Sequence, residues 1–132
     1  EELKIIRNEI LPEVGIDLNL IQLIGSETSY PWMFERDGME KLAGFADGIG
    51  PAKGLVISRE STTSNLEITP LVSRAHAAGL KVHPYTYRID PGQVPSYASD
   101  FQELLRQHYF EADVDGIFTD FPDKAVEFLE AN

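Results

Sequence analysis

The stretch Val114-Asp115-Gly116-Ile117-Phe118-Thr119-Asp120-Phe121-Pro122 decides the fold class of this chain. It is typical of a short buried strand, expected over residues 115–119, that runs into a polar turn and a final helix. Residues 46–51 repeat the same Asp-Gly-Ile entry into a strand, and residues 79–88 contain a helix end, a strand and a polar strand exit. Strands that alternate with helices and end in polar or aromatic residues indicate a parallel α/β sheet, in which chemistry gathers at the carboxyl ends of the strands.

The rest of the sequence continues this alternation. A first helix is expected over residues 1–14, with Gly15 as its C-terminal stop. The expected strands cover residues 17–24, 47–51, 81–87 and 115–119. The helices that follow the first, second and fourth of these strands cover residues 39–46, 69–79 and 123–130. The helix that follows the third strand begins behind Ser99 to Gln102, which have the spacing of a capping box. Residues 53–64 are a strand exit or a short helix. Four βα units, (βα)4, are half of a (β/α)8 TIM barrel, and a whole barrel needs about 250 residues.

The composition excludes several classes of partner. The chain carries 11 Lys and Arg against 22 Asp and Glu, a formal net charge of −11 at pH 7. Such a surface repels nucleic-acid phosphates and anionic lipid, so neither a nucleic acid nor a membrane is expected as a partner. Cysteine is absent, which excludes a disulfide or a thiolate zinc site. No apolar run approaches the ~20 residues that span a bilayer.

Three segments in the same order resemble a known family. His-Pro-Tyr-Thr-Tyr-Arg at 83–88, the helix that carries Phe101 and Leu104-Leu105, and Asp-Gly-Ile-Phe-Thr-Asp-Phe-Pro-Asp-Lys-Ala-Val at 115–126 are similar to the C-terminal portion of bacterial glycerophosphodiester phosphodiesterases, nearest the periplasmic type. The resemblance implies a (β/α)8 barrel, of which residues 1–132 form the C-terminal half-barrel with strands five to eight. The implied reaction is hydrolysis of glycerophosphodiesters to glycerol 3-phosphate and an alcohol.

The resemblance also implies where the catalytic groups lie. Such hydrolysis needs charge neutralisation at the phosphate and a proton for the leaving alkoxide, which carboxylate-bound metal and a histidine pair supply. The family places these groups in its first half, and this chain has neither a His-Arg dipeptide nor a Glu-x-Asp on an expected strand. We therefore expect Ca²⁺ or Mg²⁺ in the parent enzyme, no metal bound by this segment, no catalytic residue in it, and no activity of the chain alone.

Tyr85, Phe121 and His83 are candidates for contact with the substrate. Tyr85 stands where family members carry an aromatic residue that walls the pocket, and it shares a strand face with His83. Its alternative role is packing in the barrel core, and the same two readings apply to Phe121. His83 either points into the pocket mouth or is a packed histidine. We expect Tyr85 and Phe121 to face one cavity.

Gln22 and Trp32 complete the candidates. Gln22 is a polar residue in an apolar strand and bonds either the substrate or a neighbouring loop. Trp32 covers a glycerol or head-group moiety, or else it caps the barrel or the gap left by missing elements. Of the other polar residues, His76 and His108 are expected on the surface or in helix packing. Asp123 is interpreted as a helix N-cap, and Asp120 as the residue that fixes the turn before it.

A half-barrel leaves the strands 17–24 and 115–119 each without one neighbour. Its inner face, expected to carry Leu20, Val82 and Ile117, forms an apolar patch. The expected partner is therefore a missing N-terminal half-barrel or a second copy of the chain. A chain that begins at Glu1, inside a helix, is typical of a processed or truncated polypeptide. The alternative function is a non-enzymatic half-barrel that binds a ligand or dimerises; the expected compartment is the periplasm, with the cytoplasm as the alternative.

Overall fold

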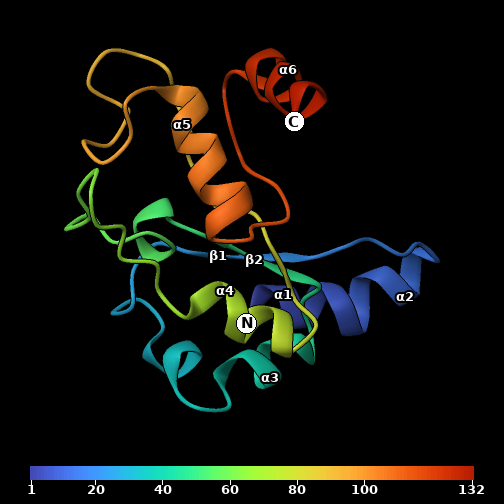
Figure 1. The fold of residues 1–132 in the computed structure, drawn as a ribbon. Helices are drawn as coiled ribbons and strands as arrows, with labels where there is room; N and C mark the ends of the chain where they lie inside the picture. Colours follow the sequence, from blue (N-terminus) through green and yellow to red (C-terminus); the bar gives the residue numbers. More distant parts are fainter.

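The computed structural model describes residues 1–132 (Figure 1). One helical segment comes first, made of α1 (Glu2–Ile5), η1 (Ile6–Ile10) and α2 (Leu11–Val14). The strands are β1 (Ile21–Ile24), β2 (Gly48–Pro51) and β3 (Lys81–Val82), and the other helical elements are η2 (Pro31–Phe34), α3 (Gly38–Ala43), η3 (Lys53–Leu55), α4 (Leu71–Ala77), α5 (Phe101–Arg106), η4 (Gln107–Glu111) and α6 (Pro122–Ala131). The first helix ends at Gly15 as predicted, because φ of +69° is a left-handed conformation that glycine adopts without a steric penalty.

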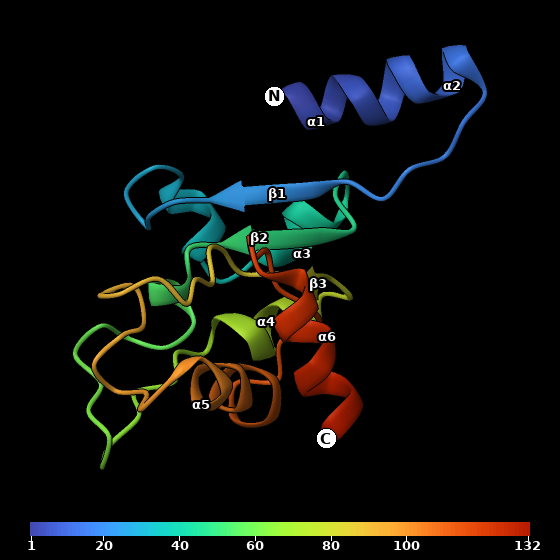
Figure 2. The ribbon, with the colours of Figure 1, turned by 90° about the horizontal axis from the view of Figure 1, so that it is seen from above.

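The three strands form one parallel sheet in the order β1-β2-β3. Ile21 is paired with Gly48, and Gly48 with Lys81, so consecutive strands are neighbours. The elements follow one another in space from the α1–α2 segment at one end to α5 and α6 at the other (Figure 2). This α/β alternation was predicted from the sequence.

The predicted fourth strand does not form a regular strand. Residues 115–119 do lie beside the chain that continues β3, with the Phe118 N–H donating to the Pro84 carbonyl at 2.9 Å and a parallel bridge between Tyr87 and Thr119. Pro84 has no N–H to donate in return. The ladder is therefore interrupted at Pro84.

The two Asp-Gly-Ile segments make the same contacts. The Asp47 carboxylate accepts the Leu20 N–H at 2.7 Å, and the Asp47 N–H donates back to the Leu20 carbonyl at 2.8 Å. Asp115 exchanges the same pair of bonds with Val82, at 2.8 and 3.0 Å. A cation accompanies each carboxylate, Arg7 at Asp47 and Lys81 at Asp115. The repeated motif thus joins each segment to the strand before it, at the amino end of the sheet.

The helices cover one face of the sheet, where Ile24, Ile49 and Val82 enter a core of 24 buried residues. The prediction that Val82 lies on the inner face is therefore wrong. Ile117 is also packed against this core and Leu20 is buried. Val82 and Ile117 therefore lie on the side that the helices cover, whereas His83, the neighbour of Val82, lies on the opposite face beside Phe118.

The opposite face of the sheet is open and apolar. Leu23 and Ile21 lie over Gly50 and Gly48, where an added Cβ would meet their side chains at 2.6 and 2.8 Å. Leu23 is 55% exposed and Phe118 is 43% exposed. We call this surface the open face. None of the helices has the length and apolar character needed to cross a bilayer.

Two of the predicted helix starts are displaced. Asp100, not Ser99, caps α5, since its carboxylate accepts the Glu103 N–H at 2.8 Å. The last helix begins at Pro122, so the prediction that Asp123 is its N-cap is wrong. Thr119 performs the role expected of Asp120: its hydroxyl donates to the Tyr87 carbonyl at 2.7 Å and accepts the Phe121 N–H at 3.0 Å.

Candidate functional site

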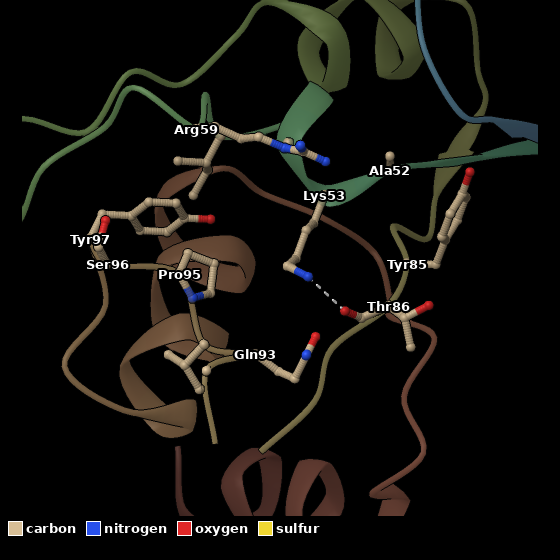
Figure 3. A pocket seen from close by; sticks show the side chains of 13 residues that line it. Ala52, Lys53, Arg59, Tyr85, Thr86, Gln93, Pro95, Ser96 and Tyr97 are labelled. Atoms are coloured by element: carbon tan, nitrogen blue, oxygen red, sulfur yellow. Dashed lines mark hydrogen bonds between the residues drawn. The ribbon is translucent and has the colours of Figure 1, made fainter. Parts of the chain in front are cut away.

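A cavity of about 600 Å³ lies at the carboxyl ends of β2 and β3 (Figure 3). Three segments form its walls: the turn after β2, from Ala52 to Arg59; Tyr85 and Thr86, which follow β3; and the loop from Gly92 to Tyr97. We call it the strand-end cavity. Its position agrees with the general rule that parallel α/β sheets bind ligands at the carboxyl ends of their strands.

The turn after β2 brings two cations to the strand-end cavity. Lys53 begins the short helix η3 and donates from Nζ to the Thr86 carbonyl at 2.9 Å, which joins the ends of β2 and β3. Burial, and then the nearby charge of Arg59, lowers the pKa of Lys53 below its usual value. The Arg59 side chain lies across Gly54, where an added Cβ would be 3.0 Å from Arg59 Nε. Because Gly54 has no side chain, the Arg59 side chain can lie close against the backbone at this position.

Residues 56–69 fold back on themselves and hold Arg59 at the cavity. An antiparallel bridge joins Ile57 and Ile68, and the Ser61 hydroxyl accepts the Glu67 N–H at 2.9 Å. The sequence left two alternatives for this region, a strand exit or a short helix. The structure has a short helix at residues 53–55. The hairpin-like excursion beyond it was not predicted.

The far wall contributes neutral polar groups. Tyr97 is 3% exposed, and burial raises the pKa of its phenol to about 12. Its hydroxyl is therefore protonated near neutral pH and is available as a donor. Gln107 donates from Nε2 to the Tyr97 carbonyl at 3.3 Å, which ties this loop to η4. In Figure 3, Lys53 points into the cavity with Arg59 beside it, and Tyr97 and Gln93 lie across from them.

Tyr85 is the only one of the five predicted site residues that lines the strand-end cavity. Its N–H donates to the Pro51 carbonyl at 3.0 Å and its carbonyl accepts the Lys53 N–H at 2.8 Å, so the backbone is fixed on both sides. An added Cβ at Gly25 would lie 3.5 Å from the Tyr85 hydroxyl oxygen. The ring therefore reaches toward the loop that follows β1.

The other four predicted residues lie elsewhere. Phe121 is half-buried at the start of α6 and does not line the strand-end cavity, so Tyr85 and Phe121 do not share that cavity. His83 lies on the open face against Phe118, with ring centroids 6.3 Å apart. Gln22 and Trp32 line a separate cavity of about 180 Å³ beside α1, and Gln22 donates to the Leu23 carbonyl at 2.9 Å. The substrate contacts of all five residues remain predictions.

The remaining histidines have structural contacts. His76 on α4 lies 2.7 Å from the Asp115 carboxylate. His108 is fully buried, with Nδ1 donating to the Leu104 carbonyl at 3.0 Å and its ring edge against Tyr87. Burial lowers the pKa of His108 to about 4. His108 thus packs within the helical layer, one of the two environments predicted for it.

Sequence reasoning missed Lys53, Arg59 and Tyr97 as site residues. The available signal was the position of Lys53, two residues after the strand that ends at Pro51, because residues in that place line the mouth of a parallel sheet. Arg59 and Tyr97 reach the cavity through loops, and no periodic pattern predicts the path of those loops.

Comparisons with known proteins agree on one family. Residues 16–124 match the Glycerophosphoryl diester phosphodiesterase family. A protein named "Glycerophosphodiester phosphodiesterase" from Haemophilus influenzae is 36% identical over 146 residues, which cover 98% of this chain and 40% of that protein. A protein of the same name from Treponema pallidum is 34% identical over 145 residues, covering 97% of the chain and 40% of that protein. The chain thus spans 40% of the length of each of these two relatives.

Proposed function

Because the chain belongs to the glycerophosphoryl diester phosphodiesterase family, we propose that it supplies part of an enzyme that hydrolyses glycerophosphodiesters. In this reaction the oxygen of water bonds to phosphorus and the bond from phosphorus to the alcohol oxygen breaks. The attacking water gives up one proton and the departing alkoxide takes one, so the products are glycerol 3-phosphate and an alcohol. The observation that carries the proposal is the family match over residues 16–124, which includes every segment that lines the strand-end cavity.

We propose further that this segment is the C-terminal half of the barrel, with strands five to eight. The family's fold is a TIM barrel, and three parallel strands in chain order, with residues 115–119 beside the third, are compatible with one half of it. The proposed compartment is the periplasm, from the resemblance of residues 83–88 and 115–126 to the periplasmic type.

The proposed enzyme uses a divalent cation, Ca²⁺ or Mg²⁺, which would neutralise charge at the phosphate. The residues of this chain do not fit such a site, because no three His, Asp or Glu side chains are close enough together to hold a metal ion. In our proposal the cation is held by the remainder of the barrel. This segment contributes binding groups, with Tyr85 as an aromatic wall of the substrate pocket.

A chimeric enzyme tests the proposed function. The chain replaces the segment of the Haemophilus influenzae relative with which it aligns, and the release of glycerol 3-phosphate from glycerophosphocholine is measured with Ca²⁺ or Mg²⁺. We expect the chimera to be active, whereas the same relative without any replacement segment should be inactive. A well-folded chimera that releases no glycerol 3-phosphate would argue against the proposal.

The chain alone is expected to hydrolyse neither glycerophosphocholine nor glycerophosphoethanolamine. The physical reason is the absence of a carboxylate cluster that could hold the cation. The measurement is product release by the purified chain with Ca²⁺ or Mg²⁺. Metal-dependent turnover that persists through repeated purification, and that is absent from a mock preparation, would overturn this prediction.

Replacing Tyr85 with alanine in the chimera should raise KM several-fold and leave kcat nearly unchanged. An aromatic wall contacts substrate and transition state alike, so its loss removes uniform binding. The matched control is Tyr85→Phe, which keeps the ring and should retain the KM of the unmodified chimera. Equal falls in kcat and kcat/KM would assign Tyr85 to transition-state stabilisation instead.

A second candidate function is a non-enzymatic module that binds a ligand or dimerises. The open face favours it, because a monomer that exposes Leu23 and Phe118 beside an unpaired strand edge is prone to pair with another chain. An inactive chimera together with a stable homodimer of the chain would favour this candidate over the enzyme.

A further inference from the structure

We propose that Lys53 and Arg59 form an anion-binding subsite in the strand-end cavity, for a phosphate or carboxylate group of the substrate. This inference rests on the proposed function and deepens it, because it identifies which part of the substrate this segment holds. Two sources supply the same chemistry: the phosphodiester itself, or an acidic group on its alcohol. We call this pair of side chains the Lys53–Arg59 subsite.

The Lys53–Arg59 subsite brings two cations into one cavity whose lining contains no carboxylate. Six of the chain's 11 lysines and arginines pair with a carboxylate, in a protein with 22 acidic residues. Lys53 and Arg59 have no carboxylate within 4.0 Å, although acidic residues outnumber basic ones two to one. The two cations approach each other closely enough for Arg59 to lower the pKa of Lys53. Like charges in one partly buried cavity cost free energy, which a bound anion would offset.

Both side chains are held in place without using up their donors. Lys53 spends one of its three N–H donors on the Thr86 carbonyl. Arg59 rests across Gly54, and its guanidinium makes no hydrogen bond within the chain. A guanidinium presents paired donors that match the oxygens of phosphate or carboxylate. The Lys53 ammonium and the Arg59 guanidinium thus both have free donors for the oxygen atoms of one anionic group.

The rest of the cavity suits a phosphate-bearing molecule. Gln93, Ser96 and the protonated hydroxyl of Tyr97 are neutral polar groups on the opposite wall. No acidic side chain lines the cavity. The volume of about 600 Å³ lies within the range of small-molecule sites. An anion would therefore meet donors on two sides and no like charge.

Titration of the chain with inorganic phosphate tests the subsite independently of catalysis. We expect saturable amide shifts in the NMR spectrum at residues 52–59 and 92–97. Arg59→Gln and Lys53→Gln should each weaken phosphate binding roughly tenfold, the size of one charge-assisted hydrogen bond. Arg59→Lys should restore part of the affinity. Arg36→Gln, the same change of charge at an exposed residue outside the cavity, should bind phosphate as the unmodified chain does.

The result that would overturn the subsite is phosphate binding that is absent, or equally weakened by Arg36→Gln and Arg59→Gln. The NMR spectrum also shows whether each variant is folded. If either Arg59→Gln or Lys53→Gln unfolds, the phosphate affinity of the other variant decides the outcome. This test does not need activity. A failed chimera with intact phosphate binding would therefore reject the proposed function alone.

Kinetics of the chimera identify the source of the anion. Arg59→Gln is compared on glycerophosphocholine, whose alcohol is cationic, and glycerophosphoserine, whose alcohol carries a carboxylate. A several-fold rise in KM for both substrates would assign the subsite to the phosphodiester. A rise for glycerophosphoserine alone would assign it to an acidic head group. Unchanged KM for both substrates in an active chimera would overturn the role of Arg59 in substrate binding.

Discussion

Replacing Asp115 with asparagine is expected to lower the free energy of unfolding by about 2 kcal/mol. The carboxylate accepts three bonds, from His76 Nε2 at 2.7 Å, the Val82 N–H at 2.8 Å and Lys81 Nζ at 2.9 Å. Its side chain is 19% exposed, so these bonds are partly shielded from water. Asparagine has one acceptor oxygen in place of two and no charge. Urea unfolding at a fixed chain concentration, followed by circular dichroism, measures the loss.

The effect of Asp115→Asn should depend on pH. Burial alone would raise the pKa of Asp115, but the bonds from Lys81, His76 and the Val82 N–H lower the pKa by more, to below its usual value. A carboxylate with a depressed pKa in the folded state stabilises the protein above its unfolded pKa of about 3.9. That contribution disappears as the pH falls through the folded pKa. The difference between the two proteins should thus be constant near neutral pH and shrink below about pH 4.

Asp120→Asn is the matched control, since the Asp120 side chain is 64% exposed and its nearest cation, Arg88, is 3.8 Å away. We expect a change below about 0.5 kcal/mol. If both variants unfold at the same urea concentration as the unmodified chain, Asp115 does not join the last segment to β3 as we describe.

The isolated chain is expected to self-associate through its open face. β1 has a neighbour on one side only, and Leu23 and Phe118 expose apolar surface beside Gly50 and Gly116. Unpaired strand edges and exposed apolar patches favour association. Light scattering should give about twice the chain mass of 14.8 kDa. Leu23→Glu, which places a charge on this face, should return the mass to that of one chain.

Val126→Glu makes the same change of charge at a similarly exposed apolar residue that lies on helix α6 and not on the sheet. It should leave the mass at that of the dimer. If the unmodified chain is a stable monomer with sharp cooperative unfolding, the apolar face does not need a partner and the half-barrel proposal loses its main physical support.

The order of the elements could be predicted because it depends on local patterns. The Asp-Gly-Ile segments at 47–49 and 115–117 marked two entries into parallel segments, and the structure shows that each Asp joins the preceding strand. Gly116 allows close approach, since an added Cβ there would lie 3.0 Å from the His83 ring. The contacts between neighbouring backbone segments thus require aspartate and glycine at these positions. Such a requirement is visible as a repeated sequence pattern.

The composition of the cavity could not be predicted because it depends on tertiary geometry. Phe121 follows residues 115–119 directly, yet the turn held by Thr119 places Phe121 at the start of α6, away from the cavity. Lys53 and Arg59 lie in the region with the weakest local signals, and the Arg59 side chain lies across Gly54, a contact that no local pattern predicts. The side-chain parity of β3 was likewise decided by packing against the helices.

We propose that this chain completes a phosphodiesterase barrel when its open face meets the remaining half. The most direct measurement mixes the chain with the Haemophilus influenzae relative that lacks its aligned segment, and records both mass and glycerol 3-phosphate release. We predict a one-to-one complex that hydrolyses glycerophosphocholine, while neither polypeptide does so alone. Leu23→Glu should weaken the complex, and Val126→Glu should not. Two well-folded polypeptides that neither associate nor release product would contradict the claim.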